Sequence, residues 1–229
     1  MIKFAIPSKG RLQADTIEWL GARGIDVARS ASDREYSAKI ANFDDVELVL
    51  MSAGEIPQAM REGRVHLGVT GQDMVQEKVP HWDSRLREVA EMSFGFADLV
   101  LAIPASWEDV RDIHDLDAVC ADFRKVTGKR LRIATKYHRL TGNYLRENDV
   151  TNFQLVDSQG ATEGVVANEY AEMISDITST GATLVANHLS ILGAPILKSQ
   201  ATIFAVTQDL SGKERTVLAS FEKVLTDAK

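Results

Sequence analysis

The chain has 229 residues, of which 45% are hydrophobic and 26% charged, so it is long enough for one large globular domain or two small ones. Its formal net charge of −7 and its lack of a basic tract argue against binding of nucleic acid, although a locally positive site for an anionic small molecule stays open. Its single cysteine excludes an internal disulfide and a cysteine metal cluster, and its short apolar runs predict neither a signal peptide nor a membrane span, so we expect a cytoplasmic protein.

The apolar residues fall in short runs that alternate with amphipathic runs, which predicts alternating strands and helices. In chain order, we expect a strand at residues 2–7, a helix at 11–24, a strand at 46–52, a helix at 55–63, a strand at 66–71, a helix at 72–78, a strand at 96–104, one or two helices within 106–128, a strand at 130–135, a helix at 137–149, a strand at 153–158, a helix at 162–171, a strand at 173–178, a helix at 183–192, a strand at 196–207 and a helix at 211–228. This order is typical of an α/β protein with mainly parallel sheets covered by helices. Cys120 falls on the apolar face of a predicted helix, where we expect its thiol to be buried rather than reactive.

The loop after the first predicted strand, "PSKGRL", carries two cations next to a glycine. Lys9 and Arg11 flank Gly10. In α/β proteins ligands gather at the carboxyl ends of strands, and such a pair suits a polyphosphate there. A solvated basic turn is the simpler explanation when the loop is taken alone.

Two further loops carry polar groups after strands. "GVTGQDM" offers a glycine turn at Gly71 and a carboxylate at Asp73, which could equally cap the next helix. Lys136 and Arg139 follow another strand and could meet an anion or only decorate the start of a helix.

The densest group of hydroxyls lies in a predicted strand-to-helix turn, whose residues are Ser179, Thr180, Gly181, Ala182 and Thr183. Such a turn directs backbone N–H groups and the positive end of a helix at one place, and the glycine allows a close approach by a ligand. Hydroxyl groups add donors, so the turn can bind a phosphate. The alternative is ordinary helix capping by serine and threonine.

Two carboxylates lie in loops or strand ends that could reach the same place. Asp176 precedes the hydroxyl-rich turn and could accept hydrogen bonds from ribose hydroxyls, or it is a solvated carboxylate at the end of a strand. Glu163 could contribute from its own loop, or it is an acid that complements the dipole of a helix. The five histidines are scattered without metal-binding spacing, and no Ser-His-Asp set can be nominated.

Four of these motifs together resemble the ATP phosphoribosyltransferase family. "PSKGRL", "GVTGQDM", "RLRIATKY" and "DITSTGATLVANHL" occur in the order and at roughly the separations of that family, from residue 2 to about residue 205. The parts "RIATKY" and "STGATLVAN" are the specific ones. The length resembles the short, catalytic form, which lacks the C-terminal regulatory domain of the long form.

The resemblance implies a fold and a set of partners. It implies two α/β lobes like those of type II periplasmic binding proteins, with the active site in the cleft between them; residues 1–95 and 190–229 form one lobe and residues 96–189 the other. It also implies a homodimer that joins a regulatory subunit related to histidyl-tRNA synthetase (the HisZ type) in a hetero-octamer.

The activity implied is the first step of histidine biosynthesis, in which phosphoribosyl pyrophosphate reacts with N1 of ATP. By this resemblance the loop at 176–183 holds the 5-phosphate on residues 179–183, and Asp176 and Glu163 serve the ribose hydroxyls directly or through a metal. Lys9 and Arg11, with Gly10 between them, hold pyrophosphate or the ATP phosphates, and Gly71 and Asp73 lie near the nucleotide. Mg²⁺ is the implied cofactor and is held mainly by substrate phosphates, so no protein ligand is assigned to it.

Three positions depart from the family pattern. Many members have an arginine where this chain has Ser52, and Arg34 is a possible substitute. Many have Gly-Ser-x-Glu where this chain has Gly-Ala-Thr-Glu at residues 160–163, so the acid is kept and the hydroxyl has moved. His188 replaces the glycine of a common Asn-Gly pair, which we expect to matter little.

Two other functions share some of these features. A non-catalytic two-lobe module that binds a solute or an effector would share the fold and needs no cation pair in the first loop. A phosphoribosyltransferase that acts on a free base usually has two adjacent acidic residues at its phosphate loop, whereas only Asp176 lies there in this chain.

Overall fold

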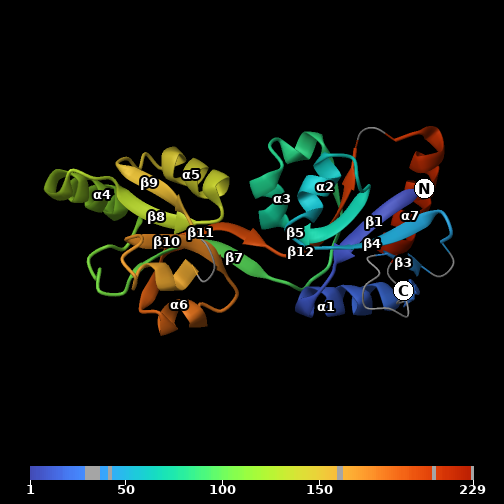
Figure 1. Ribbon diagram of the computed structural model, residues 1–229, viewed down its shortest axis with the longest axis horizontal. Coiled ribbons are helices and arrows are strands. Elements are labelled where there is room, and N and C mark those ends of the chain that lie inside the picture. Colours follow the sequence, from blue (N-terminus) through green and yellow to red (C-terminus); the bar gives the residue numbers. More distant parts are fainter. Residues whose placement is uncertain (29–36, 41–42, 159–161, 208–209, 228–229) are drawn as a thin grey trace. The chain divides into compact units, whose positions relative to one another are not determined.

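The computed structural model describes residues 1–28, 37–40, 43–158, 162–207 and 210–227 (Figure 1). The chain forms two compact units, one of Met1–Phe96 with Gln200–Lys229 and one of Ala97–Ser199, so it passes from one unit to the other twice. The second division falls after residue 199, whereas the family resemblance implied one after about residue 189. The assignment of these units as functional lobes remains a prediction.

The first unit is built on a seven-stranded mixed sheet with the order β2-β3-β4-β1-β5-β12-β6. Its strands are β1 (Ile2–Pro7), β2 (Val27–Ala28), β3 (Ser37–Ile40), β4 (Val46–Met51), β5 (Leu67–Gly71), β6 (Leu86–Glu91) and β12 (Ala201–Val206). Its helices are α1 (Gly10–Gly21), α2 (Ile56–Arg61), α3 (Gln72–Lys78), the 3₁₀ turn η1 (Trp82–Ser84) and α7 (Gly212–Thr226). The strand β1 pairs in parallel with β4 and β5, and the pairs made by β12, β3 and β2 are antiparallel.

Alternation along β1 explains how both faces of this sheet are covered. Phe4 and its neighbours at even positions point to one face, where they pack with residues of α1 and α7, including Phe221 at 5.6 Å between ring centroids. Ala5 points to the other face and packs with residues of α2 and α3, among them Ile56 and Val75. The helices therefore form a layer on each side of β1.

The second unit is built on a five-stranded mixed sheet with the order β11-β7-β10-β8-β9. Its strands are β7 (Ala97–Pro104), β8 (Leu131–Thr135), β9 (Phe153–Asp157), β10 (Met173–Thr178) and β11 (Leu189–Ser199). Its helices are α4 (Ile113–Thr127), α5 (His138–Glu147), the 3₁₀ turn η2 (Thr162–Val165) and α6 (Ala182–Ala186). Residues of α4 and α5 pack on one face of this sheet and Leu184 of α6 packs on the other. The expected burial of Cys120 is confirmed, because this residue of α4 faces the core. Burial raises the pKa of its thiol to about 12.

Three predicted elements differ from the structure. The helix expected at residues 162–171 is only the short turn η2, and the one expected at 183–192 ends at Ala186, where β11 soon begins. The strand expected at 196–207 is two strands, β11 and β12, that belong to different units. Short apolar runs do not distinguish helix from strand, and here antiparallel pairing with β7 decides for strand. The strands β2, β3 and β6 were not predicted.

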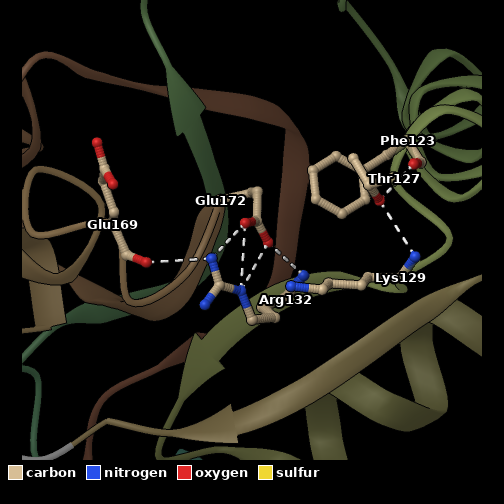
Figure 2. Close-up of polar contacts among 6 residues, drawn as sticks. All are labelled: Phe123, Thr127, Lys129, Arg132, Glu169 and Glu172. Atoms are coloured by element: carbon tan, nitrogen blue, oxygen red, sulfur yellow. Dashed lines mark hydrogen bonds and ion pairs between the residues drawn. The ribbon is translucent and has the colours of Figure 1, made fainter.

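The segment that follows η2, where a longer helix was predicted, is held by an ion pair. Figure 2 shows Arg132 of β8 with the carboxylate of Glu172: Arg132 Nη2 lies 2.6 Å from Glu172 Oε1, and Glu172 Oε2 accepts the backbone N–H of Arg132 at 2.6 Å. Arg132 Nη2 also donates to the carbonyl of Glu169, which has a left-handed φ of 56°. These contacts of Arg132 therefore fix the chain after η2 and hold the start of β10 against β8.

No helix within the described residues combines the length and the apolar composition that a bilayer crossing requires.

We expect Arg132→Gln to lower the free energy of unfolding by about 1 kcal/mol, because it leaves the largely covered carboxylate of Glu172 without its fork of donors. Urea unfolding followed by circular dichroism measures the change. Lys213→Gln is the matched control, because it removes an exposed pair with Asp45 and should change the stability by less than about 0.5 kcal/mol. Equal losses in both variants would contradict this role of Arg132.

Candidate active site

Parallel pairing brings three loops of the second unit to one edge of its sheet. The strand β8 pairs in parallel with β9 and β10, and Thr135 at its end lies opposite Asp157 of β9 and Ser175 of β10. The segments that follow these strands contain Lys136, the turn η2 and residues 179–183. The turn η2 also contacts β8 and β10. The structure therefore places Asp176, Glu163 and the hydroxyl-rich turn at the same edge.

The turn at 179–183 is held by a hydroxyl that precedes it. Thr178 Oγ1 accepts the N–H of Gly181 at 2.9 Å, and Gly181 has a left-handed φ of 74° immediately before α6. Thr180 Oγ1 lies 3.3 Å from the N–H of Ala182. The loop expected at 176–183 included Thr178 but gave this residue no role, although a threonine that ends a strand three residues before a glycine is a recognisable signal.

Packing of Leu184 holds the turn at 179–183 against the sheet, while most residues of the turn stay exposed to solvent. Leu184, in the first turn of α6, is 3% exposed and packs with Ile174 of β10 and Leu189 of β11. Residues 179, 180, 182 and 183 are exposed. Exposed hydroxyl residues on an anchored backbone are suited to binding a phosphate.

The two candidate carboxylates are half-buried at this edge. Asp176 Oδ1 accepts the N–H of Ile177 at 2.8 Å. Glu163 lies on η2, next to Thr162, whose hydroxyl is 2.6 Å from that of Ser158, and both of these hydroxyl residues are buried. The two residues before Thr162 in the family-like motif, at 160 and 161, lie outside the described residues.

Further polar groups lie at the same edge, and sequence reasoning gave them no role. His138, the first residue of α5, lies 2.7 Å through Nε2 from Asp157 Oδ1, and both side chains are substantially exposed. Thr141 of α5 is 2.8 Å through its hydroxyl from that of Ser175, in the buried layer below. The sequence could have indicated this pair, because His138 follows one predicted strand and Asp157 lies at the end of the next.

The remaining candidates belong to the first unit, where β1, β4 and β5 end at one edge. The backbone N–H of Ser8 donates to Met51 at 2.8 Å and so ties two of these ends together. Lys9 and Gly10 begin α1 and are exposed, and Arg11 is 82% exposed with its Nε 4.0 Å from Asp15. The cation pair is therefore accessible to an anion.

Gly71 and Asp73 lie at the end of β5. Gly71 precedes the first residue of α3, and Asp73 is in the first turn of that helix with 5% exposure. This burial favours the helix-stabilising alternative for Asp73. Ser52 is exposed, and its carbonyl accepts the N–H groups of Glu55 and Ile56 in the turn before α2. Arg34, its suggested substitute, lies outside the described residues.

The short helix α6 has a left-handed residue on each side. Gly181 precedes it with φ 74°, and His188 follows it with φ 56°. The second position is the one where the family commonly has glycine, and we expected the exchange to matter little. A left-handed backbone costs a residue with a side chain about 1–2 kcal/mol, so we now expect the exchange to affect stability, and its effect on function stays a prediction.

We expect His188→Gly to raise and Gly181→Ala to lower the free energy of unfolding, each by about 1 kcal/mol. A Cβ at Gly181 would meet only Ile191 Cδ1 at 3.8 Å, so the loss there comes from the backbone and not from a clash. Thermal unfolding measures both changes, with His188→Ala as the control that keeps the strain. A gain of stability in His188→Ala equal to that in His188→Gly would contradict the backbone explanation.

Comparison with known proteins gives the same family for the whole chain. The sequence model of the HisG family, ATP phosphoribosyltransferase, matches residues 52–226. The chain is 55% identical to an ATP phosphoribosyltransferase of Cereibacter sphaeroides over 205 residues, 89% of this chain and 87% of the relative. It is 44% identical to one of Mesorhizobium japonicum over 229 residues, 99% of this chain and 96% of the relative.

Solved structures show the same fold at lower identity. The chain resembles the ATP phosphoribosyl transferase (HisG:HisZ) complex from Thermotoga maritima with a TM-score of 0.73 and 23% identity, over 98% of this chain and 96% of that one. It also resembles an ABC-transporter choline binding protein, with a TM-score of 0.55 and 13% identity over 100% and 77% of the two chains. The expected α/β fold of the type II periplasmic-binding-protein kind is thereby confirmed. The expectation of mainly parallel sheets was wrong, because antiparallel strands flank the parallel group in each sheet and both sheets are mixed.

Proposed function

The chain belongs to the ATP phosphoribosyltransferase family, and we propose that it carries out the family reaction with the turn at 179–183 as its sugar-phosphate site. The family expected from the four sequence motifs is confirmed. The alternative of a non-catalytic binding module has no support from relatives that are 44% to 55% identical and named as transferases. The main support for the site assignment is the turn that follows Thr178. Its residues are exposed, and its backbone is held by the hydroxyl of Thr178.

In the proposed reaction, N1 of the adenine ring of ATP attacks C1 of phosphoribosyl pyrophosphate. The N1–C1 bond forms while the bond from C1 to the pyrophosphate oxygen breaks, and pyrophosphate leaves with the bonding electron pair. The configuration at C1 inverts, which gives N1-(5-phospho-β-D-ribosyl)-ATP. Because N1 already has a lone pair, catalysis rests on positioning and on stabilisation of charge rather than on a dedicated base.

The 5-phosphate is assigned to Ser179, Thr180, Gly181, Ala182 and Thr183. Their exposed donors follow a parallel strand, which is where α/β proteins bind phosphates. Asp176 and Glu163, at the same edge, are assigned to the ribose hydroxyls. Carboxylates that accept hydrogen bonds from these hydroxyls orient C1 toward its nucleophile.

The cations of the first unit are assigned to the other phosphates. Lys9 and Arg11, on either side of Gly10, bind pyrophosphate or the ATP phosphates, and their exposure supports this role. Gly71 and Asp73 are assigned to the surroundings of the nucleotide. The backbone of Gly71 serves that role better than the buried side chain of Asp73.

Enzymes of this family need a divalent metal ion, and we propose Mg²⁺. The described residues contain no group of three histidine, cysteine or carboxylate side chains that could hold a metal. Asp176 and Glu163 fit Mg²⁺ in another way, because this ion is commonly held by one or two carboxylates together with substrate phosphates. When bound, it would offset the negative charge of the departing pyrophosphate.

The proposed assembly follows from the Thermotoga maritima relative, which is a HisG:HisZ complex. We propose that this chain forms a homodimer and joins a regulatory subunit of the HisZ type, related to histidyl-tRNA synthetase, in a hetero-octamer. We place it in the cytoplasm, where ATP is available.

The direct test is product formation from ATP, phosphoribosyl pyrophosphate and Mg²⁺, with and without a HisZ-type partner. We expect phosphoribosyl-ATP and pyrophosphate in equal amounts by chromatography, and removal of the metal by a chelator should stop the reaction. Nucleotide binding without product in either mixture would favour the binding module. Product from adenine or uracil instead of ATP would indicate a transferase for free bases.

The sugar-phosphate site is tested by Thr180→Val. Loss of one hydrogen bond to a charged group should raise KM for phosphoribosyl pyrophosphate about tenfold to hundredfold while the fold is kept. Steady-state kinetics measure KM for phosphoribosyl pyrophosphate. Thr216→Val is the matched control, because Thr216 is an exposed threonine on α7 of the other unit. An unchanged KM in Thr180→Val, in an enzyme that is otherwise active, would refute the assignment of the loop without touching the family.

A further inference from the structure

Two adjoining hollows lie on the first unit, and neither Lys9 nor Gly71 lines them. Both are lined by Gly63 and His66, which connect α2 to the start of β5. The smaller, of about 90 Å³, lies at the starts of β5 and β6 and the end of β12. The larger, of about 380 Å³, extends over the side chains of β4. We call the two together the Gly63–His66 cleft.

The cleft is lined by cations in an acidic protein. The chain has 33 Asp and Glu residues against 26 Lys and Arg. Arg61 and Arg85 line the smaller hollow, and Lys3 and Arg64 line the larger one. Among the described residues, no carboxylate lines either hollow.

Most of these cations have no described carboxylate within ion-pair distance, although the pKa of the nearby Glu62 is lowered by a hydrogen bond from a glutamine, by Arg64 and by Arg61. Within the described part of the chain, Arg61, Arg85 and Lys3 form no ion pair. Arg64 does, with its Nε 2.7 Å from Glu62 Oε2. Two guanidinium groups around so small a hollow repel each other, and an anion between them relieves that repulsion.

His66 adds a neutral donor between the two hollows. Its Nδ1 accepts the backbone N–H of Lys3 at 2.9 Å, so the proton of the neutral ring is on Nε2. Burial lowers the pKa of His66, although Glu214 nearby acts in the opposite direction. Glu214 is itself engaged by Ser211 and lies 3.9 Å from the amino terminus.

The floor of the larger hollow is apolar. Val49, Met51 and Val65 line it beside the cations. A charged group held at one end and apolar surface at the other is the usual composition of a small-molecule site. Gly63 lines both hollows with a left-handed φ of 70°, and a Cβ built there would meet nothing within 4 Å, so the space beside this residue is open.

We propose that the Gly63–His66 cleft binds a small organic anion, with its phosphate or carboxylate group between Arg61 and Arg85 and its remainder over Val49, Met51 and Val65. The guanidinium forks match the oxygens of either group. The cleft contains none of the residues to which substrate groups are assigned, although Met51 is also the last residue of β4, and it is thus a second site on the first unit. Its occupant would contact the start of β5, the strand that ends at Gly71.

The test is a titration of the protein with inorganic phosphate and, separately, with succinate, followed by NMR of the histidine rings. The signal of His66 is identified by its loss in His66→Asn. We expect it to shift and saturate with a dissociation constant on the millimolar scale, about −4 kcal/mol. Use of both anions separates a preference for phosphate from one for carboxylate, and the Thr180→Val background weakens competing binding at the sugar-phosphate site.

The specificity of the shift is tested by Arg61→Gln/Arg85→Gln. Loss of both forks should weaken binding at least about tenfold. Arg124→Gln/Lys125→Gln, on the exposed face of α4, is the matched control and should leave the titration unchanged. A shift that chloride reproduces at the same ionic strength, that persists in the first double variant, or that is absent with both anions to about 20 mM would overturn the proposal.

Discussion

Parallel pairing of strands is the constraint on which the candidate site depends. In the second unit, β8 lies between β9 and β10 and runs in their direction, so the three loops that follow must emerge at one edge. The same holds for β1, β4 and β5 in the first unit. The flanking strands β7 and β12 run antiparallel to these groups, so each begins at the edge where its neighbour ends: Asp98 lies opposite Thr178, and Ala201 lies opposite Gly71. Strand pairing thereby brings residues that are far apart in the sequence to one edge of each sheet.

The edge of the second unit combines a rigid lower layer with accessible donors. Buried hydroxyl pairs, Thr141 with Ser175 and Ser158 with Thr162, tie the loops to the sheet without exposing unsatisfied polar atoms. Above them, the turn after Thr178 keeps its hydroxyls in solvent. A site for a sugar phosphate needs both properties, because donors that are already positioned lose little entropy on binding.

Charge is distributed for two different purposes. Arg132 with Glu172 is a cation whose partners are all supplied by the chain, and it stabilises the fold (Figure 2). Lys9, Arg61 and Arg85 have no carboxylate in ion-pair contact within the described residues. We assign anions to these three cations and to Arg11, whose Nε lies 4.0 Å from Asp15. The chain therefore has locally positive sites although its net charge is −7.

The sequence by itself determined the α/β class, the family, and the hydroxyl-rich turn at 179–183, because strand–helix alternation and turn chemistry are local properties. It also determined the burial of Cys120, which follows from the apolar face of one helix. Only the tertiary structure decided that residues 189–195 form a strand, since their pairing partner, β7, lies about ninety residues earlier in the chain. Likewise, the left-handed backbone of His188 and the convergence of Arg61 and Arg85 arise from contacts between distant segments, which no local pattern records.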